Sequence, residues 1–253
     1  MENIKKPSLF WYFTEGVRSF IEYIQCLFFL RSYPFKTIGD GHPVLVVPGL
    51  ICTDFSTRLL RKFINKLGYT AYGWELGRNM GNLKDLRDLK RLQGRIDIIS
   101  KKHNNQKITL IGWSMGGIYV REIAKMHPEM FNQVITMGSP FADTNAPTNV
   151  TWFYNLIANP NEFDKKWLDN VPNPASIRTT AIYSKQDGLV PWQVCREKVE
   201  DNLHQNIEVK GSHWGFVKNK TVLNIIADQL TFSQINPQAN LNNKQKTVYL
   251  SEV

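Results

Sequence analysis

The chain has 253 residues, 42% hydrophobic and 12% aromatic, which is enough for one domain with a single core and too little for two ordinary domains. Its 16 Gly and 12 Pro are close to average use, so collagen-like and wholly disordered classes of protein are excluded. The net charge of +9 admits nucleic acid or an anionic membrane as a partner, but the basic residues are scattered and no nucleic-acid-binding motif accompanies them. We therefore expect no nucleic-acid partner.

The N-terminal stretch from Leu9 to Leu30 is apolar and aromatic, yet it contains Glu15, Arg18 and Glu22. These charges argue against a membrane-spanning helix, and no signal-peptide cleavage site follows. The spacing predicts an amphipathic helix with a polar stripe formed by Thr14, Arg18, Glu22 and Gln25. Its broad apolar face is formed by Phe10, Phe13, Val17, Phe20, Ile24, Leu27 and Phe28. Two interpretations remain open: the helix docks on the protein's own core, or it lies on a membrane surface.

From His42 onward, short apolar runs alternate with amphipathic helices. The runs predict strands at residues 43–47, 70–74, 107–112, 133–137, 179–183 and 206–209. The helical patterns lie at residues 59–67, 82–99, 115–127 and 218–230. Such an alternation requires right-handed crossovers, so we expect an α/β fold with a mostly parallel sheet of about six strands and helices on both faces. Ligand sites in these sheets lie beyond the carboxyl ends of the strands.

Two segments do not fit the strand–helix alternation. Residues 141–176 show no strand periodicity and are rich in aromatic residues, among them Trp152, Phe153, Tyr154, Phe163 and Trp167. The stretch after residue 232 is dominated by Asn and Gln, and we expect it to be disordered. The predicted organisation is therefore an N-terminal helix (1–37), one α/β domain (38–232) with an insertion at about 141–176, and a polar tail (233–253).

The strongest motif is Gly112-Trp113-Ser114-Met115-Gly116-Gly117, which lies directly between a predicted strand and a predicted helix. A serine hydroxyl is a poor nucleophile unless it is exposed, oriented and deprotonated by a neighbour. A sharp strand-to-helix turn with small flanking residues presents the hydroxyl beyond the sheet edge and aims the first helical amides at the reacting oxygen. We predict that Ser114 is a nucleophile.

Asp187 and His213 also follow predicted strands, and with Ser114 they stand in the chain order Ser, Asp, His. In the predicted site, His213 takes the Ser114 proton and returns it to the leaving group, while Asp187 holds the imidazole tautomer. The other histidines, His42, His103, His127 and His204, precede a strand or lie in helical or connecting stretches. None of them follows a strand end where a base is needed.

Acyl transfer builds negative charge on a carbonyl oxygen, which backbone N–H groups must already face. The sequence Val47-Pro48-Gly49-Leu50 follows the first predicted strand and forms a candidate loop for this role. We expect the amides of Leu50 and Met115 to be the oxyanion donors. An ordinary Pro-Gly turn is the alternative interpretation of the loop.

Taken together, these motifs resemble the α/β-hydrolase superfamily, and its bacterial lipase/esterase-like branch in particular, over about residues 42–230. The resemblance implies a nucleophile at Ser114, an acid at Asp187, a base at His213 and oxyanion donors at Leu50 and Met115. Pro48 stands where many esterases have histidine, and a helix replaces the usual first two strands. The resemblance also places a substrate cap at residues 141–176, whose rings suit an apolar acyl pocket or only the cap's own small core.

We expect a serine hydrolase of carboxylic esters that acts through an acyl-enzyme, with lipid-like or medium-chain esters favoured and no metal or other cofactor. A thioesterase, an acyltransferase, an amidase or a non-catalytic binding protein on the same fold is the alternative. The further candidates for substrate contact are Arg78, Trp113, Trp152 and Trp214. Three scattered cysteines without a C-x-x-C pair indicate a reducing compartment, so we expect a cytoplasmic protein, with peripheral membrane contact through residues 9–30 as an open possibility.

Overall fold

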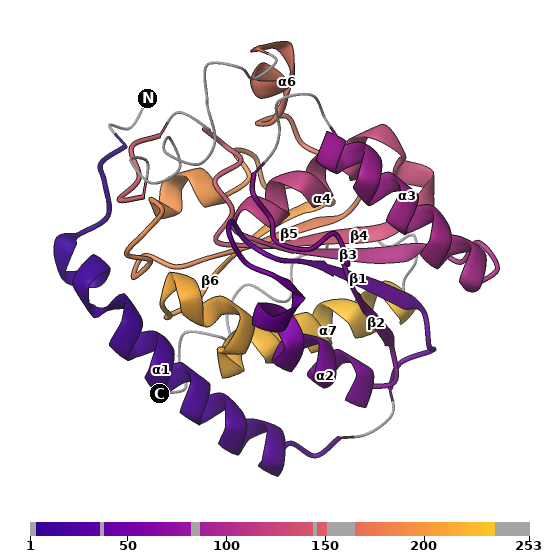
Figure 1. The fold of residues 1–253 in the computed structure, drawn as a ribbon, viewed down its shortest axis with the longest axis horizontal. Coiled ribbons are helices and arrows are strands. Elements are labelled where there is room, and N and C mark those ends of the chain that lie inside the picture. Colours follow the sequence, from indigo (N-terminus) through magenta and orange to yellow (C-terminus); the bar gives the residue numbers. More distant parts are fainter. Residues whose placement is uncertain (1–3, 36–37, 82–86, 144–145, 151–164, 236–253) are drawn as a thin grey trace.

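In the computed structural model, residues 4–35, 38–81, 87–143, 146–150 and 165–235 are described. They form a six-stranded sheet in the order β2-β1-β3-β4-β5-β6 (Figure 1). All neighbouring strands of this sheet are parallel. The strands are β1 (Pro43–Val47), β2 (Thr70–Gly73), β3 (Ile108–Trp113), β4 (Phe131–Met137), β5 (Thr179–Tyr183) and β6 (His204–Glu208).

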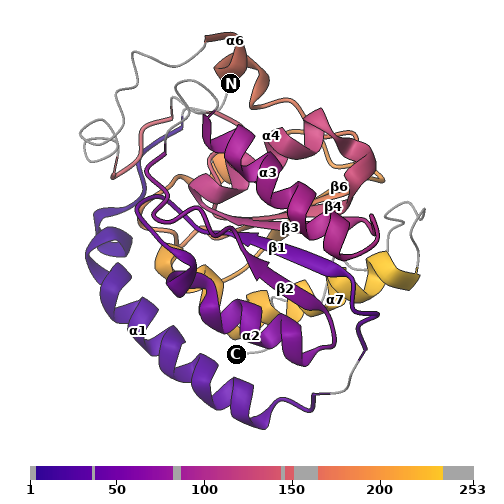
Figure 2. The ribbon, with the colours of Figure 1, turned by 45° about the vertical axis from the view of Figure 1, so that its right-hand side comes forward.

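Helices cover both faces of the sheet (Figures 1 and 2). On one face lie α2 (Arg58–Lys66) and α7 (Lys220–Ile235), with α1 (Leu9–Ser32) outside them; on the other lie α3 (Arg87–Lys102) and α4 (Met115–Met126). Alternate residues of a strand point to opposite faces. Val44 of β1 accordingly packs with the α2 and α7 side chains, and Leu45 packs with those of α3 and α4. Shorter helices are η1 (Asp54–Thr57), η2 (Pro128–Met130), α6 (Lys165–Asn170), η4 (Trp192–Cys195) and η5 (His213–Lys218).

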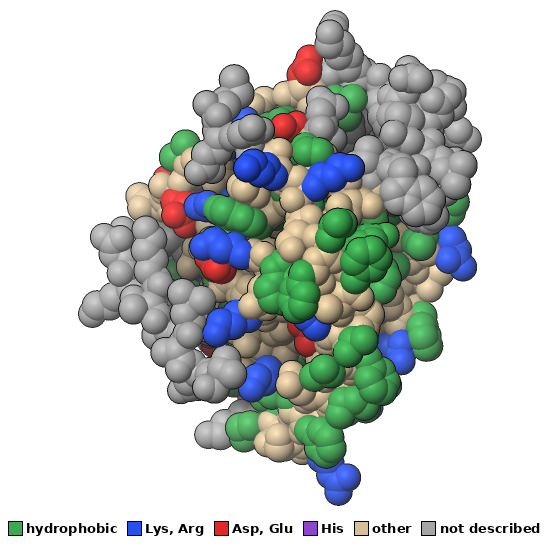
Figure 3. All heavy atoms as spheres, turned by 90° about the vertical axis from the view of Figure 1, so that its left-hand side faces the viewer, with side chains coloured by type: hydrophobic (Ala, Val, Ile, Leu, Met, Phe, Trp, Pro, Cys, Tyr) green, Lys and Arg blue, Asp and Glu red, His purple; other side chains and the backbone are tan. Residues whose placement is uncertain are grey.

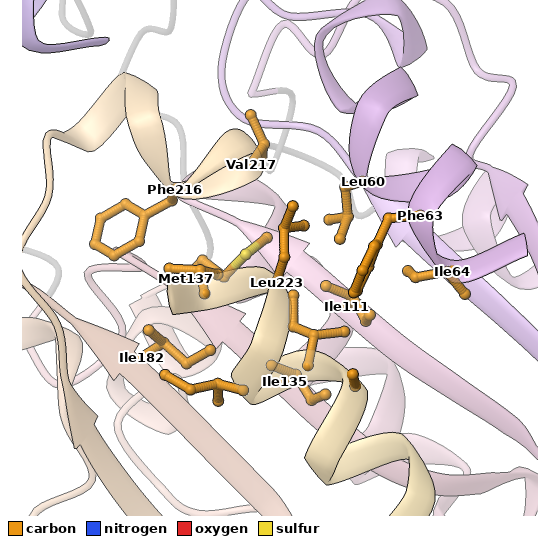
Figure 4. Close-up of a cluster of buried hydrophobic side chains, with 14 of the residues drawn as sticks. Leu60, Phe63, Ile64, Ile111, Ile135, Met137, Ile182, Phe216, Val217 and Leu223 are labelled. Atoms are coloured by element: carbon orange, nitrogen blue, oxygen red, sulfur yellow. The ribbon is translucent and has the colours of Figure 1, made fainter. Parts of the chain in front are cut away.

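The core between the sheet and α2 and α7 is formed by buried aliphatic and aromatic side chains (Figure 4). Phe63 of α2 and Leu223 of α7 lie in one cluster with Ile111, Ile135 and Ile182 of β3, β4 and β5. Burying each such side chain stabilises the fold by about 1.5–3 kcal/mol relative to leaving it exposed. This layer therefore gives the strand ends, and the loops that follow them, a rigid base.

The predicted and observed elements differ at the C-terminal end of the domain. Strand β6 begins at His204, so His204 is a strand residue and not part of a connection. The last helix begins at Lys220 and runs to Ile235, later at both ends than the hydrophobic pattern predicts. Asn219 explains the start, because its side chain accepts hydrogen bonds from the N–H groups of Thr221 and Val222 and so caps the helix. Residues 233–235 of the predicted polar tail (233–253) belong to α7. The rest of that tail and the predicted helix start near Asn82 lie outside the described residues.

Helix α1 docks on the domain through residues that lie outside its broad apolar face. Its buried residues are Glu15, Ser19, Glu22 and Cys26, while its phenylalanines at positions 10, 13, 20 and 28 are exposed. Of the predicted polar stripe, only Glu22 is buried. Helix α1 therefore packs on the domain, as in the docking interpretation, while the phenylalanines of its apolar face remain exposed. Among the described helices, α1 included, none is long and apolar enough to span a bilayer.

Candidate active site

The turn from β3 into α4 holds Ser114 in a backbone conformation that L-residues seldom adopt. Ser114 has a φ of 53° and a ψ of −123°, which costs about 1–3 kcal/mol and persists only where the surroundings enforce it. Close packing enforces it here: a side chain on Gly112 would collide with the backbone of Gly117, and one on Gly116 with the backbone of Val47. The Ser114 hydroxyl is thus presented beyond the carboxyl ends of the strands on a rigid support.

Ser114, His213 and Asp187 form a chain of hydrogen bonds. The Ser114 Oγ lies 3.0 Å from His213 Nε2, and His213 Nδ1 lies 2.6 Å from Asp187 Oδ2. The second oxygen, Oδ1, accepts the backbone N–H groups of Leu189 and Val190 at 2.8 and 2.9 Å. The carboxylate is thereby fixed with Oδ2 toward the imidazole. Such an arrangement keeps the proton on Nδ1 and leaves Nε2 to accept a proton from a hydroxyl.

The charge of the buried His213 side chain depends on two carboxylates. Burial disfavours the imidazolium and by itself lowers the pKa of His213, whereas Asp187 and, to a smaller extent, Glu15 favour the imidazolium and raise it. The combined effect of the two carboxylates is larger than the effect of burial, so the pKa of His213 lies above its ordinary value. A base with a raised pKa holds an abstracted proton more tightly, which suits removal of a proton from a hydroxyl.

The loop after β1 is braced by Asn79, a buried residue that the sequence motifs did not reveal. The Asn79 side chain donates to the carbonyl of Pro48 at 2.8 Å. Its backbone carbonyl accepts the N–H of Ile51 at 2.6 Å, and its own N–H donates to the carbonyl of Cys52 at 2.9 Å. Ile51 has a positive φ of 57°, so the loop turns sharply here and needs such support. Asn79 thus fixes residues 48–52 as one rigid unit.

The two predicted oxyanion donors, Leu50 and Met115, come from segments that flank Ser114. A side chain on Gly49 would lie 3.3 Å from the Ser114 Cβ, so the loop that contains Leu50 passes directly beside the serine. Met115 is the first residue of α4, and the first N–H groups of a helix have no partner within it. Both segments are therefore adjacent to Ser114, and the positive end of the α4 dipole lies at the residue that follows it.

A cavity of about 720 Å³ opens beside Ser114 and His213. Its wall is mostly apolar and combines α1, the loop after β1, η1 and η5; prominent members are Phe20, Tyr23, Leu50, Phe55, Trp113 and Trp214. This size is typical of pockets for small organic ligands, which combine an apolar wall with a few polar groups at fixed places. The cavity can hold an apolar chain whose end lies at the serine.

The comparisons with known proteins agree with this architecture. The sequence model described as the alpha/beta hydrolase fold matches residues 85–176, which include β3, the Ser114 turn and α4. The chain has the α/β-hydrolase fold. No curated protein has a significantly similar sequence.

Solved structures of low sequence identity share this α/β-hydrolase fold. A mature lipase from Bacillus licheniformis matches with a TM-score of 0.57 and 17% identity, over 78% of this chain and 93% of that one. A monoacylglycerol lipase from Paleococcus ferrophilus matches at 0.55 and 15%, over 75% and 93%. The thioesterase domain from the curacin biosynthetic pathway matches at 0.52 and 12%, over 76% and 91%. At these identities the likeness concerns the fold alone.

In this α/β-hydrolase-fold chain, two buried carboxylates of α1 hold the loops at the site. Glu15 Oε1 accepts the backbone N–H of Gly188 at 2.8 Å and that of His213 at 3.0 Å. Glu22 accepts the N–H of Ser212 at 3.0 Å and also the Ser212 hydroxyl. A buried donor left without a partner costs about 1–3 kcal/mol. Helix α1 therefore completes the hydrogen bonding of the two loops that carry the candidate acid and base.

In the sequence, Glu15 and Glu22 argue only against a membrane-spanning helix and do not point to the site, although two glycines indicate a close contact there. A side chain on Gly188 would collide with the backbone of Trp11, and one on Gly215 would overlap the Glu22 carboxylate. Glycine leaves room for another segment to approach closely, and both glycines lie within two positions of a candidate catalytic residue. The sequence does not show which segment approaches, because Trp11 and Glu22 lie far from these glycines along the chain.

The remaining predicted contact residues have different surroundings. Trp113 and Trp214 line the cavity, and the Trp113 ring N–H donates to the carbonyl of His213 at 3.1 Å. Arg78 is exposed and donates to the carbonyl of Ile51 at 2.8 Å; its contact with a substrate stays a prediction. Four aromatic residues expected in the cap lie outside the described residues, namely Trp152, Phe153, Tyr154 and Phe163; Trp167 belongs to α6, but its side chain is not described.

Proposed function

We propose that the protein is a serine hydrolase that cleaves carboxylic esters. The observation that carries this proposal is the hydrogen-bonded chain from Ser114 through His213 to Asp187, anchored on a strained turn beside an apolar cavity. Structural packing alone gives no reason to place a serine in a strained turn with its hydroxyl 3.0 Å from a histidine base.

In the proposed reaction, His213 Nε2 takes the proton of the Ser114 hydroxyl while Oγ attacks the carbonyl carbon of the ester. The carbonyl π electrons move to its oxygen, which the N–H groups of Leu50 and Met115 would receive. When the tetrahedral intermediate collapses, the alcohol oxygen takes the proton from Nε2 and leaves. Water then repeats the sequence on the acyl-enzyme, releasing the carboxylic acid and restoring the serine. Asp187 stabilises the imidazolium in both halves.

The cavity supports a lipid-like or medium-chain acyl ester as substrate. Its wall is mostly apolar, with Phe20, Phe55 and Trp214 among its members, and its charged residues are Arg58 and Lys218. Burial of an apolar chain contributes about 0.8 kcal/mol per methylene. Two of the structurally similar proteins are named as lipases, one of them a monoacylglycerol lipase, which supports the same substrate class.

A fluorophosphonate probe tests the proposal, because it modifies only an activated serine. We expect stoichiometric labelling of the wild-type chain, none of Ser114→Ala, and turnover of p-nitrophenyl esters by the wild type alone. A matched control is Ser56→Ala, which removes another hydroxyl from the cavity wall and should keep both signals.

Absence of labelling in a folded wild-type chain would favour a non-catalytic binding protein. Faster turnover of a thioester than of the oxygen ester with the same acyl chain would favour a thioesterase, and ester formation with an added alcohol would favour an acyltransferase.

A further inference from the structure

Helix α1 presents a continuous row of large apolar side chains to solvent. Phe10, Phe13, Val17, Phe20 and Phe28 are each between 63% and 76% exposed. They recur at helical spacing and so form one line along the helix. Figure 3 shows hydrophobic side chains gathered on this side of the molecule. Contiguous apolar surface of this kind marks an interaction site in soluble proteins.

The row leads to the opening of the Ser114 cavity. Phe20 belongs both to the row and to the cavity wall. Three further exposed apolar side chains line the same cavity from other elements: Ile51 after β1, Phe55 in η1 and Trp214 in η5. The apolar surface is therefore continuous from α1 across the mouth of the cavity. Anything that covers the row also lies against the entrance to the candidate active site.

The surroundings of the row are positively charged. Lys5 and Lys6 precede α1, and Arg31 lies in its last turn; all three are exposed. The only acidic residues of α1, Glu15 and Glu22, are buried against the domain. Helix α2 lies beside the C-terminal half of α1, as the 6.0 Å separation between the Phe29 and Phe63 rings shows. It contains no acidic residue, and its exposed cations are Arg58, Lys62 and Lys66.

We propose that this face binds the surface of an anionic phospholipid bilayer, with the apolar row of α1 inserted among the lipids and the cations at the headgroups. A bilayer offers an apolar layer and a negative surface together, and amphipathic helices with aromatic and basic residues use both. A second copy of the chain would match the apolar row but would bring its cations against the same cations, which disfavours self-association. The inference that the bilayer supplies the substrate rests on the proposed function. The inference that this face binds a bilayer does not.

Vesicle binding of the full chain tests the proposal. It is measured by co-sedimentation in a Ser114→Ala background, so that turnover plays no part. The vesicles are made of phosphatidylcholine alone or of equal parts of phosphatidylcholine and phosphatidylglycerol. We expect binding that is stronger to the phosphatidylglycerol vesicles and weaker in high salt. The triple variant Phe13→Gln, Val17→Gln, Phe28→Gln should bind on the order of a hundredfold more weakly, because three apolar side chains no longer insert.

A matched control replaces three apolar side chains that are similarly exposed elsewhere: Ile98→Gln, Met126→Gln, Val199→Gln. This variant should bind vesicles like the parent.

With Ser114 restored, the α1 triple variant should lose hydrolysis of esters presented in vesicles and keep hydrolysis of a soluble short-chain ester. Vesicle binding without turnover of any ester would contradict the proposed function but would still support the proposed binding surface.

Equal vesicle binding by the two triple variants would overturn the proposal, as would no binding by the parent chain. Light scattering identifies the competing occupant. A parent chain that forms dimers, with the α1 triple variant monomeric and neither bound to vesicles, would assign the row to a second copy instead.

Discussion

The backbone N–H of His213 donates to Glu15 Oε1 at 3.0 Å, so a carboxylate of the N-terminal helix holds the candidate base. The same carboxylate raises the pKa of the His213 side chain. Helix α1 therefore contributes both geometry and charge to a site whose other candidate groups follow the strands of the sheet.

Glu15→Gln should move the acid limb of the kcat/KM–pH profile to lower pH. The glutamine oxygen can still accept from the amides of Gly188 and His213, but the negative charge is lost. Because that charge raises the pKa of His213, its removal lowers the pKa, and the base stays neutral further into acid. Glu22→Gln is the matched control, since Glu22 is not among the groups that raise the pKa of His213, and this variant should leave the limb in place. A profile that Glu15→Gln does not move would show that Glu15 acts through packing alone.

Ser114→Ala should lower ester turnover by several orders of magnitude, because the covalent step is removed. The fold should remain, since the side chain is small and the strained turn is set by the surrounding glycines. Turnover of p-nitrophenyl butyrate and thermal unfolding measure the two effects separately. Activity close to wild type in the folded variant would disprove the mechanism.

Asp187→Asn should reduce kcat on the order of 10⁴-fold, as in the best-characterised serine triad. The reason lies in the two amides that Asp187 Oδ1 accepts, from Leu189 and Val190. The asparagine oxygen must keep these bonds, so its NH₂ group faces His213 Nδ1 and stabilises the tautomer with the proton on Nε2. That tautomer cannot accept the Ser114 proton. Near-normal kcat in this variant, with Asp143→Asn inactive instead, would show that the acid is misassigned.

The Ser114 turn and the positions of Asp187 and His213 after strands could be predicted, because each of these features is determined by nearby sequence. Alternating apolar runs fix the strands, and parallel strands bring the residues that follow them to one edge of the sheet. The contact between Glu15 and His213 could not be predicted, because 198 positions separate the two residues. For α1, hydropathy predicts that the apolar face is buried, and this is wrong. The rule that apolar side chains lie inside takes no account of backbone N–H groups in loops that need an acceptor. Asn79 was missed for the same reason, as it serves backbone groups of another loop.

Gly215→Ala should destabilise the protein and reduce activity together, because the new methyl group would overlap the Glu22 carboxylate and push α1 from the loop that carries His213. We expect a loss of about 2 kcal/mol or more in the free energy of unfolding, the range for overpacking and broken buried hydrogen bonds. Gly94→Ala in α3 is the matched control, because no atom other than those of its chain neighbours and of the backbone of its own helix lies within 4 Å of the added methyl group. It should stabilise the protein by about 0.5–1 kcal/mol and leave kcat unchanged. Equal unfolding free energies for the two variants would contradict the close packing of α1.

The acyl-chain preference tests whether the cavity beside Ser114 binds substrate. If its apolar wall takes the acyl chain, each added methylene should gain up to about 0.8 kcal/mol of burial, roughly a threefold to fourfold rise in kcat/KM until the cavity is full. The measurement is kcat/KM for p-nitrophenyl esters from acetate to decanoate, below their micelle concentrations. Phe20→Ala removes a ring from the wall and should flatten the series, whereas Ile98→Ala changes an exposed residue of α3 and should not. A series that is flat or falling in the wild type would exclude lipid-like esters and leave a hydrolase of small esters or thioesters.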